Sequence, residues 1–303
     1  MSTHVAFLGL GAIGRPMARH LARDPFTLAV WNRTPAAAAS FVAEYPGVRH
    51  ATSPADAARG ATIVVTCLPT SADVAALLDG DDGLLAGLER GSTLVDCTSG
   101  DPATSRRIAE TLAARGIGFL DAPVSGGTSG AERGTLTVMV GGDGAVLDRV
   151  RSMLDAFGER IVHCGPIGAG DAVKAVNNAL LAVNLWAAGE GLAALTAAGV
   201  DPALALEVIN GSSGRSNATQ TLIPERVLTR AFPRTFRLAL LDKDLGIAAG
   251  IARAERVPSP LLQHAAELWH IARQQLGEEA DHVEVVRLIE DWAGVTIAPA
   301  ATA

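Results

Sequence analysis

A glycine-rich turn near the start of the sequence constrains the fold of this chain more than any other feature. Residues 5–8 form a short apolar run that predicts a β-strand, and Gly9-Leu-Gly11-Ala-Ile-Gly14 follows directly. Between a strand and a helix, G-x-G-x-x-G is typical of a dinucleotide-binding unit, because the helix N-terminus favours the pyrophosphate. A glycine turn without a ligand is the alternative. The predicted cofactor loop comprises Gly9, Gly11, Ala12, Ile13 and Gly14.

The end of the second predicted strand, residues 27–31, indicates which dinucleotide is preferred. An NAD-using protein usually has Asp or Glu here to bind the ribose hydroxyls, whereas this chain has Asn32-Arg33-Thr34. A guanidinium can bind a 2′-phosphate through two hydrogen bonds. We therefore predict that NADP(H) is preferred, with NAD(H) as the second cofactor, unless Arg33 is simply solvated on a loop.

Further strand-like runs cover residues 62–68, 92–96, 118–120, 135–140 and 160–164. In a parallel sheet, ligands bind beyond the carboxyl ends of the strands. The residues predicted to border a nicotinamide are Leu68, Pro69, Thr98 and Ser99. After the run at 118–120, Ser125-Gly126-Gly127 exposes backbone N–H groups that could form an anion-binding concavity beside a hydroxyl. An ordinary loop of the same composition is the alternative.

A long helix is predicted from about residue 170 to 198, because the segment is rich in Ala and Leu and has no internal proline. Val173, Val176, Leu180 and Val183 share one face, and the opposite face is hardly more polar, so we expect both faces to be buried. Lys174 and Asn178 lie four residues apart and therefore stack on successive turns. Burial lowers the pKa of a lysine and suits it to acid/base chemistry; a snorkelling lysine is the alternative.

The break at Gly165-Pro166 separates two kinds of pattern. Before it, strands alternate with helices, and after it no strand is predicted, only Ala- and Leu-rich helices. We predict an α/β Rossmann-type N-terminal domain (residues 1–165) and an all-α C-terminal domain (residues 166–303), joined by the long interdomain helix.

The composition excludes several classes of protein. With 303 residues, 49% of them hydrophobic, the chain can build two sizeable cores. The net charge of −7 without a long basic cluster makes nucleic acid and anionic membranes unexpected partners. No signal-like segment or apolar run of about eighteen residues occurs, so no membrane span is expected. The three separated cysteines fit a reducing cytoplasm, and neither His nor Cys shows metal-ligand spacing.

Four motifs in this order resemble the β-hydroxyacid dehydrogenase family, which includes 3-hydroxyisobutyrate dehydrogenases and glyoxylate/succinic semialdehyde reductases. They are GLGAIGRPMARHL at 9–21, DAPVSGGTSGAERGTLTVMVGG at 121–142, GAGDAVKAVNN at 168–178 and LLDKDLGIA at 240–248. The resemblance extends over nearly the whole chain. This chain departs from the family pattern at two places. Ile13 stands where relatives usually have Met, and Asp96-Cys97-Thr98-Ser99 stands where they usually have Asp-x-Ser-Thr.

The resemblance implies a role for each matching residue. Lys174 is the expected general acid/base and Asn178 its partner in positioning the substrate. The substrate carboxylate is expected to bind to Ser125, Gly126 and Gly127. Phe236 is expected to line the substrate site. Lys243 is expected to lie on the cofactor side of the helical domain. Asn32-Arg33-Thr34 matches the NADP(H)-preferring branch. The helical domain is expected to bind substrate and form a homodimer or homotetramer.

The expected function is the NADP(H)-dependent interconversion of a short β-hydroxy acid and its aldehyde or keto acid. An imine reductase or reductive aminase on the same fold is the first alternative, although those relatives generally lack the lysine. A non-catalytic NADP(H)-binding module is the second. Decarboxylating sugar-phosphate dehydrogenases usually have a larger helical domain. The sequence leaves the substrate, its stereochemistry and the physiological direction open.

Overall fold

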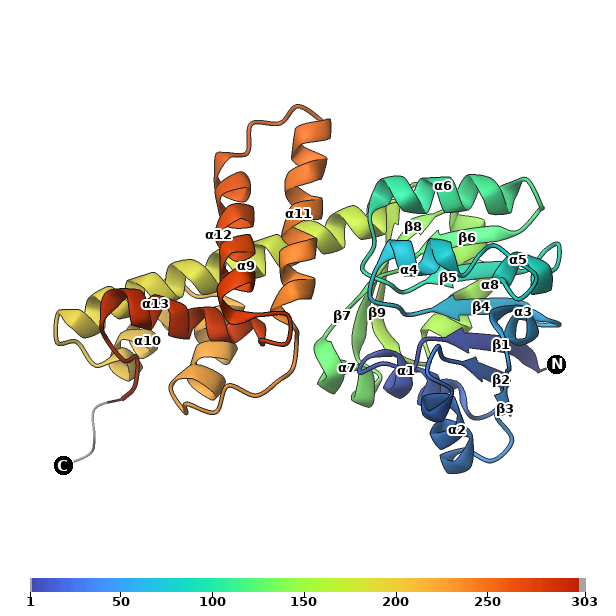
Figure 1. Ribbon diagram of the computed structural model, residues 1–303, viewed down its shortest axis with the longest axis horizontal. Coiled ribbons are helices and arrows are strands. Elements are labelled where there is room, and N and C mark those ends of the chain that lie inside the picture. Colours follow the sequence, from blue (N-terminus) through green and yellow to red (C-terminus); the bar gives the residue numbers. More distant parts are fainter. Residues whose placement is uncertain (1, 300–303) are drawn as a thin grey trace. The chain divides into compact units, whose positions relative to one another are not determined.

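A computed structural model describes residues 2–299 of the chain (Figure 1). The chain forms two compact units, which divide between Lys174 and Ala175 within the long helix α9 (Ala169–Ala197). The sequence pattern had suggested residue 165, just before this helix begins. The first unit is a Rossmann-type α/β domain and the second is all-helical, which confirms the predicted fold class.

The sheet of the first unit has the strand order β3-β2-β1-β4-β5-β6-β8-β7, and β9 also pairs with β8. The pairs from β3 to β6 are parallel, whereas β8 is antiparallel to both β6 and β7. The carboxyl ends of β1, β4, β5 and β6 therefore meet at one edge. The strands are β1 (Thr3–Leu8), β2 (Phe26–Trp31), β3 (Arg49–His50), β4 (Ile63–Thr66), β5 (Thr93–Asp96), β6 (Gly118–Asp121), β7 (Val124–Ser125), β8 (Leu136–Gly142) and β9 (Gly158–Gly165).

Helices cover both faces of this sheet because successive strand residues point to opposite sides. Phe7 and Val65 point to the face covered by α1, α2, α7 and α8. Leu8 and Val64 point to the face covered by α3, α4, α5 and α6. The helices are α1 (Gly14–Leu21), α2 (Pro35–Glu44), α3 (Pro54–Ala58), α4 (Ser71–Ala76), α5 (Leu84–Gly87), α6 (Pro102–Ala113), α7 (Gly127–Arg133) and α8 (Gly144–Leu154).

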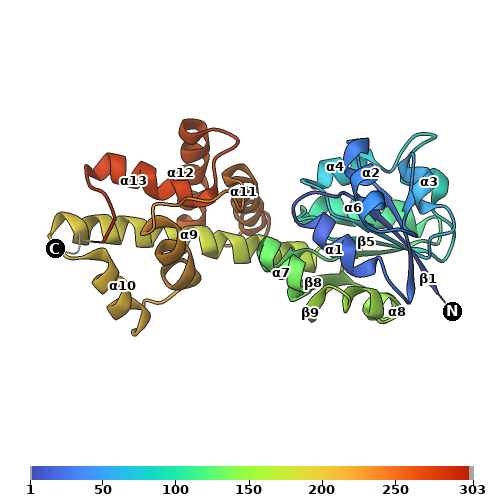
Figure 2. The same ribbon diagram turned by 90° about the horizontal axis from the view of Figure 1, so that it is seen from below.

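The helical unit has its own core, in which Trp269 is fully buried. Figure 2 shows α10 and α13 on opposite sides of α9. As predicted, no strand element follows β9 within residues 2–299, although Arg237 and Asp281 form an isolated bridge. A ten-residue π-helix, with Pro224 inside it, was not predicted. The elements are α10 (Pro202–Asn210), the π-helix η1 (Ala218–Val227), α11 (Leu238–Ala254), α12 (Pro260–Leu276), the 3₁₀-helix η2 (His282–Glu284) and α13 (Val285–Ala293).

Within the single chain only one face of α9 is buried, so the expectation of two buried faces is wrong for the isolated chain. Val173, Val176 and Leu180 are exposed, Leu180 by 55%. The buried face carries Lys174 and Asn178. Both polar side chains have interaction partners in the fold, which the apolar composition of the helix does not indicate. Within residues 2–299, α9 alone is long and apolar enough to span a membrane, and the core helix of a soluble protein passes the same test.

Candidate active site

The three glycines of the cofactor loop meet different surroundings. A Cβ at Gly9 would lie 2.3 Å from the Cys67 carbonyl oxygen, and a Cβ at Gly14 would lie 2.0 Å from the Gly9 carbonyl oxygen. A Cβ at Gly11 would meet no described atom within 4 Å. The packing of the protein therefore requires glycine at the first and third positions but not at Gly11. The open space at Gly11 fits a pyrophosphate that approaches the backbone at the start of α1.

Asn32 supports the glycine loop. Its Oδ1 accepts a hydrogen bond from the Leu10 N–H (2.9 Å), and its Nδ2 donates to the Thr34 carbonyl (3.1 Å). Arg33 has a side chain that is 84% exposed, and its guanidinium lies 3.7 Å from the Asp73 carboxylate. The guanidinium is thus at the surface beside the adenosine end of the predicted cofactor site. Its side chain is not packed in place.

The ends of β4 and β5 are joined by hydrogen bonds. The Thr98 hydroxyl accepts from the Leu68 N–H (3.0 Å), and the Asp96 carboxylate accepts from the Thr66 hydroxyl (2.8 Å) and the Thr98 N–H (3.0 Å). Burial raises the pKa of Asp96 to about 6. Thr98 is buried and Ser99 is partly exposed. The Thr98 hydroxyl therefore connects two loops, and the Ser99 hydroxyl lies nearer the surface.

The segment Ser125-Gly126-Gly127 connects β7 to α7. Ser125 is half-buried and pairs with Thr137 of β8. Gly126 and Gly127 have φ angles of 134° and 63°, where a side chain would be strained. The sequence predicted a loop here, whereas the structure has a two-residue strand and a short helix on either side of Gly126. The glycines place consecutive N–H groups at the start of α7.

Lys174 and Asn178 lie one turn apart on the same face of α9, and both are buried, Lys174 with 8% exposure. The Asn178 Nδ2 donates to the Asp244 carboxylate of α11 at 2.6 Å. Asp244 also lies 3.1 Å from the Nζ of Lys243. The sequence singled out both Asn178 and Lys243, but not the carboxylate between them.

Two further carboxylates anchor the N-terminus of α9. Asp121, at the end of β6, accepts from the N–H groups of Gly168 (2.7 Å) and Asp171 (3.0 Å). Asp171, in the first turn of α9, accepts from the Gly100 N–H (3.0 Å) and the Ser105 hydroxyl (2.6 Å). Burial raises the pKa of both carboxyl groups. The first turn of α9, and Lys174 with it, is thereby attached to the carboxyl edge of the sheet.

In the helical unit, Asp281 holds the backbone of Phe236. Its carboxylate accepts from the N–H groups of Phe236 (2.7 Å) and Thr235 (2.6 Å), and it lies 2.9 Å from His282 Nδ1. Burial opposes ionisation of Asp281, but the hydrogen bonds from His282 and from these N–H groups outweigh it and hold the pKa well below its usual value. The half-buried Phe236 ring packs against the His282 ring at 5.5 Å between centroids.

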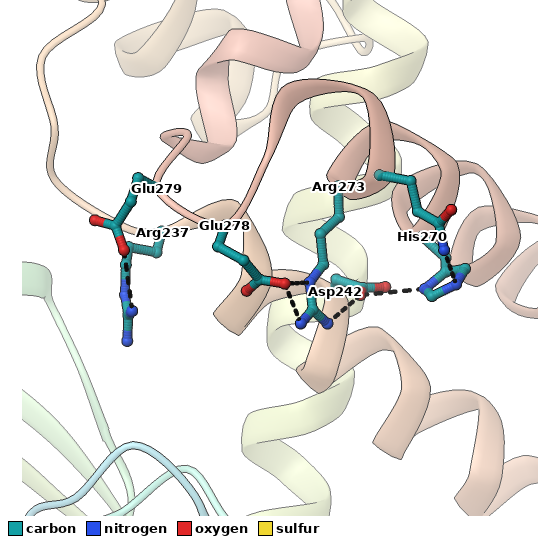
Figure 3. Close-up of polar contacts among 7 residues, drawn as sticks. Arg237, Asp242, His270, Arg273, Glu278 and Glu279 are labelled. Atoms are coloured by element: carbon teal, nitrogen blue, oxygen red, sulfur yellow. Dashed lines mark hydrogen bonds and ion pairs between the residues drawn. The ribbon is translucent and has the colours of Figure 1, made fainter.

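A second polar cluster of this unit joins α11 to α12 (Figure 3). Asp242 lies 3.1 Å from Arg273 and 3.6 Å from His270, and Arg273 also binds Glu278 at 2.6 Å. These contacts hold the segment that carries Lys243. Within residues 2–299, no group of three or more His, Cys, Asp or Glu side chains is arranged to hold a metal ion.

Two family descriptions match the two parts of the chain. Residues 4–165 match the NAD binding domain of 6-phosphogluconate dehydrogenase, and residues 168–289 match the NAD-binding domain of NADP-dependent 3-hydroxyisobutyrate dehydrogenase. A 2-(hydroxymethyl)glutarate dehydrogenase of Eubacterium barkeri is 36% identical over 98% of this chain and 98% of its own length. The chain belongs to the β-hydroxyacid dehydrogenase family.

Other members of the β-hydroxyacid dehydrogenase family match it equally well. An NAD-dependent L-serine dehydrogenase of Pseudomonas aeruginosa is 36% identical over 96% of this chain and 99% of its own. The structure of Mycobacterium tuberculosis 3-hydroxyisobutyrate dehydrogenase with L-serine superimposes with a TM-score of 0.87 at 32% identity, covering 95% of this chain and 99% of that one. This β-hydroxyacid dehydrogenase is thus an enzyme that acts on CH–OH groups with a nicotinamide cofactor.

Proposed function

We propose that this enzyme interconverts a short β-hydroxy acid and the corresponding aldehyde or keto acid, with NADP(H) as the preferred cofactor and Lys174 as the general acid/base. The observation that carries the proposal is the buried lysine on α9. Its helix is anchored by Asp121 and Asp171 to the same sheet edge as the glycine loop. An amine held in place on a fixed helix can transfer a proton to or from the substrate hydroxyl.

The chemistry divides between the cofactor and the chain. A bound nicotinamide accepts or supplies the hydride at the carbinol carbon. Lys174 takes the hydroxyl proton in oxidation and returns it in reduction. The N–H groups of Ser125–Gly127 bind the substrate carboxylate, and Asn178, held by Asp244, orients the hydroxyl.

The named relatives support a definite substrate class. Their substrates, 2-(hydroxymethyl)glutarate, L-serine and 3-hydroxyisobutyrate, all contain the unit HOCH₂–CH(R)–COO⁻. One site can accept this unit if it binds the carboxylate and presents the primary alcohol to the lysine. We therefore propose a substrate with the same unit, in which R remains to be assigned by measurement.

The proposed preference for NADP(H) depends on Arg33. Its exposed guanidinium can turn toward a 2′-phosphate, and no acidic residue occupies the position of Asn32. Asp73, 3.7 Å away, weakens the positive field there. The L-serine dehydrogenase relative is NAD-dependent, so both cofactors belong in the test.

We further propose a homodimer or homotetramer in the cytoplasm. The support for self-association is the exposed apolar stripe of Val173, Val176 and Leu180 on α9, because exposed clusters of large apolar side chains mark interaction surfaces. Light scattering at micromolar concentration tests the oligomer, and a monomer would contradict it. Fractionation of the cells that produce the protein tests the location.

The deciding experiment follows the absorbance of NADPH and NADH with glyoxylate, succinic semialdehyde, methylmalonate semialdehyde and tartronate semialdehyde. We expect turnover that favours NADPH. Lys174→Ala should lower turnover by about 10²–10⁴, the usual range for a general acid or base, without loss of cofactor binding. Wild-type turnover in this variant would refute the role of Lys174. Binding of NADPH without turnover would redirect the assay to ketone–amine pairs.

A further inference from the structure

We propose that Asp171 is a positioning residue that holds Lys174 in register with the loop after β5, and that Asp121 fixes the helical turn on which both depend. The proposal rests on the proposed role of Lys174. All the contacts that carry it lie within the first unit, which includes Lys174.

Asp171 joins the lysine helix to the loop expected to border the nicotinamide. Its two carboxylate oxygens accept from the Gly100 N–H and the Ser105 hydroxyl. Gly100 directly follows Ser99, and Ser105 lies on α6. Lys174 follows Asp171 by three residues and therefore lies on the next turn of α9. One buried side chain thus links the turn before the lysine to the end of β5.

Asp121 holds the same turn from β6. Its carboxylate accepts from the N–H groups of Gly168 and Asp171, two of the donors that a helix start leaves without an intrahelical partner. The backbone is packed tightly around the Asp121 carboxylate. A Cβ at Gly141 would lie 2.5 Å from Asp121 Oδ1, and a Cβ at Gly170 would lie 2.2 Å from the Met139 carbonyl oxygen. The start of α9 therefore has little freedom to shift along the sheet.

This rigidity has a catalytic use. A catalytic group displaced by about 1 Å can lose roughly 10²-fold in rate, so a general acid on a helix needs that helix fixed in both rotation and translation. Capping the first turn requires an acceptor for its N–H groups, which Asp121 supplies. Asp171 instead uses its carboxylate on Gly100 and Ser105, outside the helix. That contact aligns α9 with the loop after β5.

The partners of the two carboxylates predict opposite outcomes for the same substitution. Both partners of the Asp121 carboxylate are N–H donors, so Asp121→Asn sets an amide NH₂ against one of these N–H groups. Asp171 has one N–H partner and one hydroxyl partner, and the hydroxyl can accept as well as donate. Asp171→Asn can therefore keep both hydrogen bonds, whereas Asp171→Ala loses both.

The test is a double-mutant cycle between Asp171→Ala and Lys174→Ala. It is read as single-turnover oxidation of NADPH, with the most rapidly reduced of the four aldehydes named above as hydride acceptor, and with NADPH affinity and thermal midpoint measured in every variant. We expect Asp171→Ala and Asp121→Asn to lower the rate about tenfold to a hundredfold with NADPH affinity retained. Asp171→Asn should restore most of the rate that Asp171→Ala loses. In the Lys174→Ala background, Asp171→Ala should have no further effect on the rate.

Additive effects of the two alanine substitutions, or an Asp171→Asn variant as slow as Asp171→Ala, would overturn the proposal. If Asp171→Ala does not fold, Ser105→Ala replaces it in the cycle, because it removes one of the two hydrogen bonds and keeps the carboxylate. The same criterion of additivity applies. A Lys174→Ala variant that turns over normally would instead refute the proposed function, so the two failures are distinguishable.

Discussion

The substitutions Gly11→Ala and Gly14→Ala should separate cofactor binding from folding, although the two glycines belong to one motif. The methyl group of Gly11→Ala meets no described atom within 4 Å, and the φ of Gly11 lies outside the left-handed region. We expect its stability to be unchanged or raised by about 0.4–1 kcal/mol through the unfolded chain. The methyl group of Gly14→Ala would lie 2.0 Å from the Gly9 carbonyl oxygen, so β1 and α1 must separate.

The magnitudes follow from the position of each methyl group. An extra methyl in a filled space costs about 1–3 kcal/mol. Placed against the pyrophosphate, this corresponds to a loss of NADPH affinity of roughly 5- to 150-fold for Gly11→Ala. For Gly14→Ala the methyl group meets backbone, so we expect a loss of stability of about 3 kcal/mol, which lowers the thermal midpoint by about 6–12 °C for a unit of this size. The Gly14→Ala variant should therefore unfold at a lower temperature than the wild type, whereas the Gly11→Ala variant should fold normally and bind NADPH weakly.

The assay is fluorescence titration with NADPH beside thermal melting monitored by circular dichroism. Gly91→Ala is a poor control because its φ is positive. Gly250→Ala lies on α11 outside the four motifs, and its methyl group meets no described atom within 4 Å, so it provides a neutral control. A Gly11→Ala variant with wild-type affinity for NADPH would refute the assignment of the loop. A Gly11→Ala variant as unstable as Gly14→Ala would refute the packing argument.

Three further outcomes follow from the site. Arg33→Ala should weaken NADPH binding roughly 10- to 150-fold and leave NADH binding unchanged, as titration of both cofactors would check. Asp96→Asn keeps both hydrogen bonds, which end on Oδ1, but cannot titrate. The pKa of Asp96 in the folded state is raised to about 6, so the folded protein binds more protons than the unfolded chain between about pH 4 and 6. The free energy of unfolding of the wild type should therefore fall by roughly 2–3 kcal/mol relative to Asp96→Asn as the pH rises from about 4 to 6. Urea titrations at both pH values would check this. Replacing the substrate carboxylate by an amide should lower kcat/KM roughly 10- to 150-fold, because the substrate loses its charge and one acceptor oxygen while its carbonyl oxygen can still accept from the N–H groups.

The fold was predictable because its main elements carry strong local signals. The strands at Val5–Leu8 and Ile63–Thr66 are apolar runs that end at turn residues, and α9 has no helix breaker. The two-residue strands β3 and β7 are too short for a periodic pattern, and tertiary pairing alone defines them. The exposed face of α9 was not predicted, because Val173, Val176 and Leu180 form an apolar stripe of the kind that usually faces a core.

The candidate site was predictable where a motif carries the chemistry and not where a partner is distant in sequence. Lys174 and the glycine loop stand out in the sequence itself. Asp121 was missed because its partner, the Gly168 N–H, lies 47 residues away and is a backbone group. Asp244 was missed although it is in the motif that contains Lys243, because its contact with Asn178 spans 66 residues. Aspartates directly after a strand or in the first turn of a helix were the available signal.

Under the proposed function, the site separates the part of the substrate that reacts from the part that varies. In this proposal Lys174 and Ser125–Gly127, which lie in the motifs, bind the HOCH₂ and carboxylate groups that the substrates named for the relatives share. The same proposal leaves the R group to side chains outside these motifs, where each methylene is worth only about 1–3 kcal/mol. Discrimination among R groups is therefore a difference in kcat/KM of roughly 10- to 200-fold per methylene, measured among substrates that all turn over. Ranking kcat/KM across a series that varies R alone assigns the substrate, because the carboxylate and the hydroxyl contribute equally to every member.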